Sequence, residues 1–206
     1  MAFMSAAAQL KVSGERTTHL WVRWANAAID SERLSVAAKE QRTPEQWHPY
    51  LGAEFTHGMV AVCAAVSSVT TLMFELGQTV VPAGVQKWAD PEKKAPKLPG
   101  IIEAVLRGCL VGQQAAPHLA KSWEPHIKRR NEAIHFIPEP RPSVPYEGFN
   151  VAIEDANYSA TVATGAIDLL LKTFDTIAED SKPAIRKLAA GIHGQADAMR
   201  QRRSSA

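Results

Sequence analysis

A chain of 206 residues, of which 46% are hydrophobic and 21% charged, has the composition of a soluble globular protein and the length for one sizeable core. The formal net charge of +2 is too small to indicate binding to nucleic acid or to a membrane by itself, so any such role has to rest on local charge. The longest apolar run, "MVAVCAAV", is much shorter than the ~20 residues of a membrane span, and the first residues lack the pattern of a signal peptide. We therefore expect a cytoplasmic protein that does not enter a membrane.

The two cysteines, Cys63 and Cys109, lie in the apolar stretches "VAVCAAV" and "LRGCLVG". This pattern is typical of small buried side chains in a reducing compartment, with a disulfide between the two as the alternative. Two cysteines do not supply a metal framework, and the sequence predicts no cofactor.

Helical periodicity begins after a short N-terminal segment. Residues 1–16 have no clear apolar stripe and are expected to be flexible, whereas residues 17–40 repeat their apolar positions every three or four residues and predict a helix. Two prolines interrupt the period in residues 41–50, which are predicted to be a connector. The helix predicted at residues 51–77 is apolar on most of its sides, which is typical of the central helix of a bundle.

The second half of the chain repeats this pattern. Residues 82–100 are rich in proline and lysine and predict a long solvated loop, which is followed by helices at 101–111 and 116–136. A proline-rich loop then leads to a helix at 153–178. A last helical segment at 183–203 is weakened by two glycines.

These elements contain no internal repeat and no predicted strand. The predicted fold is therefore all-α, a bundle of four core helices with helical additions at both ends. As domains, we expect a flexible N-terminus at 1–16, the bundle at 17–180, and a C-terminal helical extension with a basic tail at 181–206.

One charged residue interrupts the apolar stripe of the helix predicted at 116–136. Arg130 falls inside a sector about 100° wide that a buried helix face normally occupies. Asn131 lies at the border of this sector and His135, one turn later, lies beside Asn131, whereas Lys128 and Arg129 are expected to point outward into solvent. The apolar residues that share the sector with Arg130 are Leu119, Ala120, Trp123, Ile127 and Ile134.

An unpaired charge inside a core lowers the free energy of unfolding by roughly several kcal/mol. Arg130 therefore needs a partner or a route to solvent. It could form an ion pair with a carboxylate of a neighbouring helix, or its guanidinium could reach solvent past Trp123. His135, taken alone, could be a helix C-terminal residue that the helix dipole favours. The carboxylates available for the ion pair are Glu54, Glu75 and Asp155.

Arg130 and His135 together have a chemistry that neither residue has alone. A guanidinium is a permanently charged fork that suits a phosphate, and an imidazole transfers a proton near neutral pH. If both face one cleft, they can break a ribose–phosphate bond without a metal. The histidine then moves the proton, and the arginine stabilises the charge that accumulates on the phosphoryl group.

The segment "RRNEAIHF" resembles the arginine–polar–three-residue–histidine signature of the HEPN (higher eukaryotes and prokaryotes nucleotide-binding) domains. Arg130, Asn131 and His135 stand at the matching positions. In that family the motif ends one helix, a loop follows, and a long apolar helix closes the bundle. Residues 138–150 match the loop and residues 153–178 match the closing helix.

The resemblance in architecture covers about residues 50–178 and implies an HEPN-like helical bundle. The insertion at 82–100 and the last helix have no counterpart in the minimal bundle of that family.

The resemblance also implies a function. It suggests a metal-independent endoribonuclease that cleaves RNA through attack of the 2′-hydroxyl, in the setting of a toxin or a phage-defence effector. Arg130 and His135 would be catalytic, Asn131 would position one of them, and Arg129 and Lys128 would bind the RNA. The alternative is a non-catalytic interaction or scaffold module of the same fold.

The same resemblance implies a homodimer with the motif at the interface. One histidine per chain is too few for a reaction that uses both an acid and a base, and a two-fold axis would present two histidines to one phosphate. An antitoxin or another regulatory protein is the further partner that this reading implies.

Two pairs of residues on the predicted helices have more than one interpretation. Glu54 and His57 could join the site as an orienting acid and an auxiliary base, or they could lie at a solvated helix start. His118 and His126 lie on similar faces of one helix but lack a third ligand, so no metal site is predicted.

Aromatic and basic residues elsewhere could also contact RNA. Trp21 and Trp24 could stack on bases, although their helical spacing favours a place in the core. The basic runs at 93–97 and 200–203 suit the steering of a phosphate, or they are a solvated loop and a frayed terminus.

Overall fold

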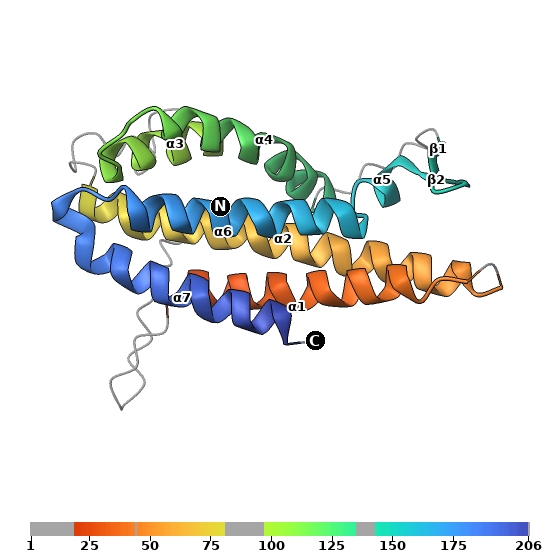
Figure 1. The fold of residues 1–206 in the computed structure, drawn as a ribbon. Coiled ribbons are helices and arrows are strands. Elements are labelled where there is room, and N and C mark those ends of the chain that lie inside the picture. Colours follow the sequence, from red (N-terminus) through yellow and green to blue (C-terminus); the bar gives the residue numbers. More distant parts are fainter. Residues whose placement is uncertain (1–18, 44, 81–96, 135–142, 206) are drawn as a thin grey trace.

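The computed structural model describes residues 19–43, 45–80, 97–134 and 143–205, and these ranges are predominantly helical, as the sequence predicts. The N-terminal segment 1–16, most of the loop predicted at 82–100, and His135 lie outside the described residues. In chain order the elements (Figure 1) are α1 (Leu20–Glu40), α2 (Trp47–Val80), α3 (Leu98–Cys109), α4 (Ala115–Ile134), β1 (Ser143–Tyr146), β2 (Phe149–Ala152), α5 (Ile153–Ala156), α6 (Ala160–Glu179), the 3-10 turn η3 (Pro183–Ile185) and α7 (Arg186–Ser204).

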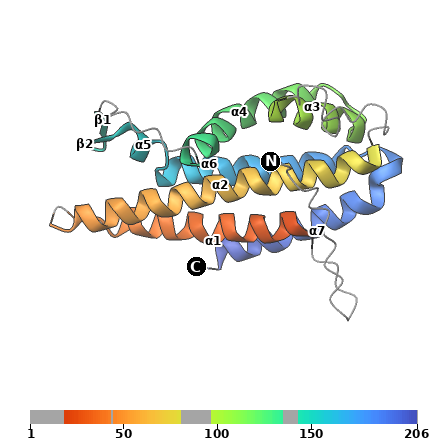
Figure 2. The same ribbon diagram turned by 180° about the vertical axis from the view of Figure 1, so that it is seen from behind.

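The helices pack around α2. α1 runs antiparallel to α2 along most of its own length, α6 packs on another side of α2, and α7 lies against α1 and α6. α3 and α4 form a separate layer that covers α2 and α6 (Figures 1 and 2). Each helix thus buries one apolar side against its neighbours, which is how a bundle stabilises helices that are marginal alone. Leu20, Trp24 and Leu34 of α1 lie outside this buried side and are exposed.

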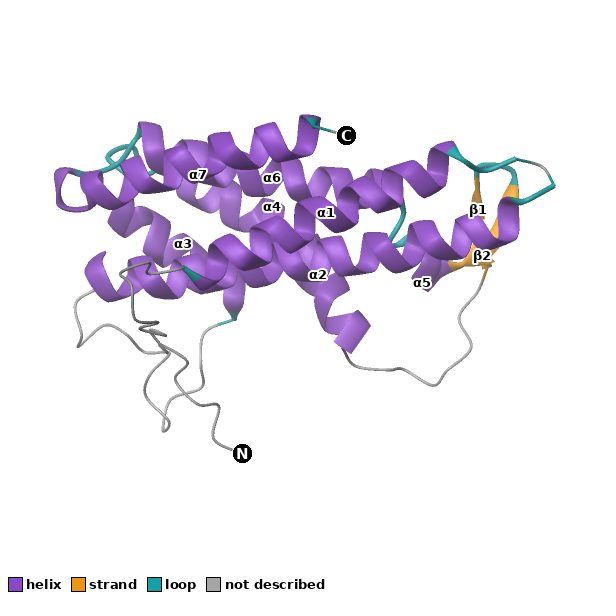
Figure 3. Cartoon of the chain, turned by 90° about the horizontal axis from the view of Figure 1, so that it is seen from below, coloured by secondary structure: helices purple, strands orange, loops and turns teal. Residues whose placement is uncertain are grey.

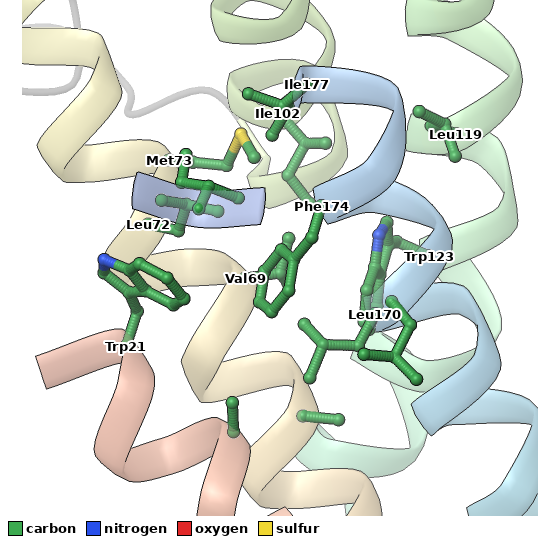
Figure 4. Packing of buried hydrophobic residues seen from close by; sticks show 14 of the residues in the cluster. Trp21, Val69, Leu72, Met73, Ile102, Leu119, Trp123, Leu170, Phe174 and Ile177 are labelled. Atoms are coloured by element: carbon green, nitrogen blue, oxygen red, sulfur yellow. The ribbon is translucent and has the colours of Figure 1, made fainter. Parts of the chain in front are cut away.

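Aromatic side chains fill the centre of the core. Figure 4 shows Phe174 of α6 beside Val69 of α2, between Trp21 and Trp123. The rings of Trp21 and Phe174 pack edge to face, with their centroids 5.2 Å apart and their planes at 67°. Trp123 donates a hydrogen bond from Nε1 to Thr173 Oγ1 (3.1 Å), so its polar atom is satisfied inside the core. Trp21 is therefore a core residue, as its spacing favours.

Within the described residues, α2 is long and apolar enough to cross a membrane. The central helix of a bundle meets the same criteria, and 56% of its most apolar window is buried inside the fold. The contacts of α2 with α1, α3, α4 and α6 account for the buried part of this window.

Several predicted helix boundaries differ from the observed ones. α2 begins at Trp47 and includes Pro49, because a proline in the first turn removes no intrahelical hydrogen bond. α3 begins at Leu98, inside the predicted loop, and has Pro99 in its first turn for the same reason. The predicted helix 153–178 is divided into α5 and α6, since residues 157–159 leave the helical conformation.

The absence of strands was a wrong prediction, because β1 and β2 form an antiparallel hairpin in which Tyr146 pairs with Phe149. Its two turn residues, Glu147 (φ 46°) and Gly148 (φ 88°), both adopt the left-handed conformation of a tight hairpin turn. Figure 3 shows the hairpin at one end of the bundle, beside the connection between α1 and α2. The aromatic side chains of the hairpin belong to a small second core, in which the ring of Phe149 stacks on that of Trp47 with their centroids 4.2 Å apart.

α4 is bent and its buried stripe ends early. Pro125 lies inside the helix, where it cannot donate a hydrogen bond to the carbonyl four residues earlier, and α4 curves over the bundle (Figure 1). Ile127 is the last buried residue of the stripe. Ile134 is 61% exposed, so its predicted place in the core is wrong.

The basic tail is held in place, which agrees with neither of its two interpretations, a frayed terminus or a free phosphate-steering run. Arg203 pairs with Glu32 of α1 and Asp168 of α6, each at 2.7 Å, and Arg202 pairs with Asp30 at 2.6 Å. Arg200 pairs with Asp175. These arginines are committed to α1 and α6, so they are poorly placed to steer a phosphate.

Candidate phosphate-binding site at the end of α4

Arg130 lies in the last two turns of α4, half-buried and without a neutralising partner among the residues that the structure describes. Its Nε is buried and has no hydrogen-bond partner. No carboxylate in the described part of the chain forms an ion pair with Arg130, and this includes the three expected candidates. Glu75 pairs with His19 at 2.7 Å, and Glu54 is engaged in a separate cluster.

The guanidinium of Arg130 acts on Cys63 of α2. Burial raises the pKa of the Cys63 thiol, and the nearby Arg130 charge opposes part of this rise. Both cysteines are free thiols, and Cys109 is fully buried, whereas Cys63 is half-exposed and so deviates from the expected burial. Arg130 therefore lies over the middle of α2, where the core covered by α4 gives way to the surface.

Arg129 is also half-buried, although the sequence predicts that it points outward. Its Nε is buried without a hydrogen-bond partner, and its charge acts on His126. Two adjacent guanidinium groups thus lie at the end of α4 with no anion between them among the described residues. Two adjacent cations of this kind attract anions, and the geometry of a guanidinium fork suits a phosphate in particular.

His126 is one turn before these arginines and is a residue that sequence reasoning weighed only as a metal ligand. Burial, and to a smaller extent the charge of Arg129, lowers its pKa to about 4. Its ring meets Trp123 edge to face with centroids 6.0 Å apart, and Nδ1 is buried without a partner. His126 is therefore a neutral imidazole at pH 7. The signal that could have found it is its spacing, three and four residues before the two arginines.

The depressed pKa of His126 predicts a pH dependence of stability. The unfolded chain binds a proton at His126 near pH 6.5 and the folded chain only near pH 4, so the free energy of unfolding is expected to fall as the pH drops from about 6.5 toward 4. With the exposure of the ring taken into account, the loss is about 1–2 kcal/mol. Urea unfolding at pH 7 and pH 5 measures it, and His126→Gln should remove this part of the dependence. An equal pH dependence in both chains would contradict the assignment.

Asn131 and Lys128, which flank the two arginines, are not buried with them. Asn131 is exposed, and Lys128 is an exposed surface charge 3.9 Å from Glu132. His135 lies outside the described residues, so its place relative to Arg130 is not described here.

Tyr158 fixes the end of α4 to the rest of the bundle. It lies between α5 and α6, and its hydroxyl donates a hydrogen bond to the carbonyl of Arg129 (2.6 Å). Its backbone in turn lies directly on Gly58 of α2, where a Cβ atom would be 1.8 Å from the Tyr158 carbonyl oxygen. The two arginines are thus positioned by a contact that depends on a glycine in the central helix.

Glu54 is a structural residue and does not lie at a solvated helix start. It is fully buried, and its Oε1 accepts hydrogen bonds from the Tyr146 hydroxyl (2.6 Å) and from the backbone N–H of Ala160 (2.9 Å). Its Oε2 lies 3.4 Å from Arg42, whose guanidinium covers the ring of Tyr146. The N–H of Ala160 is at the start of α6, so a carboxylate of α2 caps that helix.

This cluster continues to the hairpin turn. Arg42 also pairs with Glu147, and Lys39 pairs with Glu147 at 2.7 Å. The pKa of Glu147 is lowered, mainly by the hydrogen bond from Lys39. The pKa of Tyr146 is raised, mainly by burial and then by its hydrogen bond to Glu54. Since the partners of Glu54 lie in the hairpin, in α6 and before α2, Glu54 is not available as an auxiliary acid beside Arg130.

The other sequence candidates contribute little to the site. His57 is half-buried on α2. Trp24 is 40% exposed on α1, so the core position that its spacing favours is wrong. His118 is exposed, and no group of metal-ligating side chains occurs in the ranges that the structure describes. Of the basic run at 93–97, only Lys97 is described, at the start of α3.

The site at the end of α4 therefore consists of Arg129 and Arg130, with the neutral His126 and the Cys63 thiol beside them. Comparison with known proteins finds no family model, no curated protein and no solved structure that matches the chain.

Proposed function

We propose that the protein is an HEPN-type, metal-independent endoribonuclease. In this proposal Arg130 binds and stabilises the scissile phosphate, His135 transfers the proton, and Asn131 positions one of them. Arg129 and Lys128 hold the neighbouring phosphates of the RNA. The HEPN-like fold is part of the same proposal, since it rests on the motif and on the order of the helices around it.

The observation that carries the proposal is the unpaired state of Arg130. Among the partly buried arginines of the described ranges, Arg42 and Arg203 are each held by two carboxylates. Arg33 also has an unpartnered buried Nε, but its Nη1 donates a hydrogen bond to the carbonyl of Arg202. Arg130 has a buried Nε and no ion pair in the described ranges, and Arg129 beside it is in the same state. Leaving a guanidinium half-desolvated costs stability, and a phosphate ligand would offset that cost.

The reaction follows from these roles. The 2′-oxygen of the ribose forms a bond to phosphorus while the bond from phosphorus to the 5′-oxygen breaks, which leaves a 2′,3′-cyclic phosphate and a 5′-hydroxyl. A histidine accepts the proton of the 2′-hydroxyl, and a second one donates a proton to the departing 5′-oxygen. Arg130 stabilises the charge on the phosphoryl oxygens between the two steps. The second histidine comes from a second copy of the chain, so the proposed enzyme is a homodimer with the motif at the interface.

Cleavage of a 5′-labelled RNA in the presence of a chelator tests the proposal. The wild type is expected to cut, His135→Ala to lower the rate about 10²–10⁴-fold, and Arg130→Ala about 10²–10³-fold. Arg130→Lys keeps the charge but loses the fork, so it should recover only part of the rate. Thermal unfolding of each variant checks that it is folded.

Two variants serve as matched controls. Lys121→Ala removes an exposed charge of the same helix outside the proposed RNA contacts and should change the rate only a few-fold, and His126→Gln removes the other histidine of the α4 end. If His126→Gln abolishes cleavage while His135→Ala does not, the catalytic histidine is misassigned. RNA that stays intact with every chain at micromolar concentration contradicts the enzyme and favours the non-catalytic module.

The setting of a toxin or defence effector is proposed from the resemblance. If this setting is right, cells that express the wild type stop growing, and cells that express His135→Ala grow normally. An antitoxin would be the partner that restores growth when it is expressed together with the wild type.

A further inference from the structure

The last helix, α7, lies on the outside of the bundle, along α1 and α6 and away from α4 (Figure 1). Its buried residues are Ala189, Ile192, Ala196 and Met199, which recur at steps of three and four and form one narrow stripe. Two of the four are alanines. The apolar area that holds α7 in place is therefore small compared with that of α2 or α6, whose buried faces carry many more large side chains.

Ion pairs supply much of the remaining contact of α7. The guanidinium of Arg203 donates to both carboxylate oxygens of Glu32, which is 3% exposed and also accepts a hydrogen bond from Thr164 Oγ1 (3.0 Å). Arg202 donates to both oxygens of Asp30, each at 2.6 Å. Because forked pairs of this kind fix the geometry as well as adding attraction, α7 is recognised largely by its arginines.

The surface that α7 covers is acidic. We call it the α1–α6 groove and define it by the residues that pair with α7 or line the space beside it, which are Asp30, Glu32 and Arg33 of α1 and Asp168, Leu171, Lys172 and Asp175 of α6. Four carboxylates against two cations give this set a negative charge. Arg33 donates a hydrogen bond to the carbonyl of Arg202 (3.2 Å), at the end of α7 where the helix dipole favours a positive charge. The groove thus recognises both the arginines and the direction of the helix that it holds.

α7 does not fill the groove. A cavity of about 430 Å³ remains between α6 and α7 and opens to solvent. The ion pairs of Arg200 with Asp175 and of Arg203 with Asp168 border this space. The two helices therefore touch here through long charged side chains, whereas closely packed apolar side chains hold the other helices of the core.

The chain just before α7 is anchored, whereas α7 itself is a weak helix. The N–H of Lys182 donates to the carbonyl of Cys109 (2.8 Å), and Ile185 is buried in the core. α7 then begins without a side-chain cap and contains Gly191 and Gly194. A Cβ atom at either glycine would have no neighbour within 4 Å, so the glycines lower the helix propensity without allowing a close contact. α7 can therefore leave the groove as one unit, with its hinge at Ile185, while the rest of the bundle keeps its contacts.

We propose that the α1–α6 groove is a docking site for a basic amphipathic helix of a partner protein, and that α7 is a detachable strap that occupies the groove until the partner replaces it. The partner helix places apolar residues on the groove at steps of three and four, and it places arginines where Arg200 and Arg203 lie. Its recognition combines a helix in a groove with complementary charge. A nucleic acid does not fit this surface, because its phosphates would face the carboxylates of Asp30, Asp168 and Asp175.

α7 and the partner helix exclude each other from the groove. The apparent affinity of the partner is therefore its intrinsic affinity reduced by the fraction of chains in which the groove is free. A change that loosens α7 without altering the groove raises this fraction and with it the affinity. The groove is on the side of α6 that faces away from α4 (Figure 1), so docking can be measured whether or not the chain cleaves RNA.

Hydrogen exchange of the full chain tests whether α7 detaches by itself. The amides of α7 are expected to exchange faster than those of the buried part of α2. Raising the salt concentration from about 0.1 M to about 1 M shortens the Debye length from about 10 Å to about 3 Å, and it should speed the exchange of α7 about 10-fold and leave that of α2 unchanged. If the amides of α7 exchange as slowly as those of α2 at both salt concentrations, α7 is not a detachable strap.

A labelled peptide probes the free groove. It has the sequence of residues 186–205 with a fluorescein at its N-terminus, and fluorescence anisotropy measures its binding to the full chain. The Met199→Asp chain should bind it at least about 10-fold more tightly than the wild type does, because a carboxylate on the buried stripe detaches the chain's own α7. Ala198→Asp adds the same charge at the neighbouring exposed position and should bind the peptide as the wild type does.

A second chain loosens α7 through its ion pairs alone. It carries Arg200→Gln together with Arg203→Gln, leaves the buried stripe of α7 unchanged, and should also bind the peptide more tightly than the wild type does. The test therefore does not depend on the folding of the Met199→Asp chain. Circular dichroism checks that the bundle of each chain is folded.

Variants of the groove identify the docking surface. In either loosened chain, Glu32→Gln should lower the affinity for the peptide at least about 10-fold, because it removes the charge that the arginine fork binds. Glu103→Gln removes a carboxylate from a surface ion pair on α3 and should not change the affinity. The proposal is overturned if the wild type and both loosened chains bind the peptide equally, or if Glu32→Gln leaves its affinity unchanged.

Discussion

Gly58→Ala is expected to destabilise the fold by about 3 kcal/mol or more. The new Cβ atom would lie 1.8 Å from the carbonyl oxygen of Tyr158, which is backbone and cannot rotate away, so α2 or the α5–α6 joint has to move. Urea unfolding at pH 7 measures the loss. Because the Tyr158 hydroxyl binds the carbonyl of Arg129, the same change should also weaken any activity that depends on the end of α4.

Gly52→Ala is the matched control for this prediction. Gly52 is in the same helix, and a Cβ atom there has no neighbour within 4 Å. Alanine is the better helix former, so this variant should be about 0.5–1 kcal/mol more stable than the wild type. If both variants had the stability of the wild type, the close contact of Tyr158 with α2 would be wrong.

Glu54→Ala is expected to cost about 3–5 kcal/mol of unfolding free energy. The change leaves the Tyr146 hydroxyl and the N–H of Ala160 without their acceptor, and it removes one of the two carboxylates that neutralise the buried Arg42. Glu54→Gln keeps an oxygen for both hydrogen bonds and loses only the charge, so its cost should be about half as large.

Glu75→Ala provides the comparison for Glu54. Glu75 is on the same helix and pairs with His19, but both side chains are about one-third exposed, so its loss should cost less than about 1 kcal/mol. Urea unfolding of the three chains gives the order. A Glu54→Ala chain as stable as Glu75→Ala would show that the buried cluster contributes no more than a surface pair.

The helices could be predicted where their signal is local. The stripes of α2 and α6 and the burial of Trp123 follow from apolar residues at steps of three and four, which act within one helix. For α1 the same spacing predicts the helix but the wrong face, because Leu20, Trp24 and Leu34 are exposed and Trp21, Ala25 and Ile29 are buried. The hairpin gave no such signal. Its strands have four residues each, one contains a proline, and its turn is Glu-Gly, whose first residue rarely adopts a positive φ.

The candidate site was predictable only in part. The position of Arg130 in the α4 sequence marks it as unusual, and it is half-buried with no ion pair to any carboxylate of the described ranges. The structural role of Glu54 was not predictable, because its partners Arg42, Tyr146 and Ala160 come from three separate segments of the chain. The pKa of His126 also depends on tertiary burial, which periodicity describes only as a tendency.

The bend at Pro125 divides α4 into two segments with separate opening behaviour. The segment before the proline is anchored by Trp123 in the core, so its amide hydrogens should exchange only when the whole bundle unfolds. The segment after it, which carries Arg129 and Arg130, is joined to it by one fewer backbone hydrogen bond and ends in exposed side chains. Its amides should exchange through local fraying, and an anion bound at the arginines should slow that exchange without affecting the first segment.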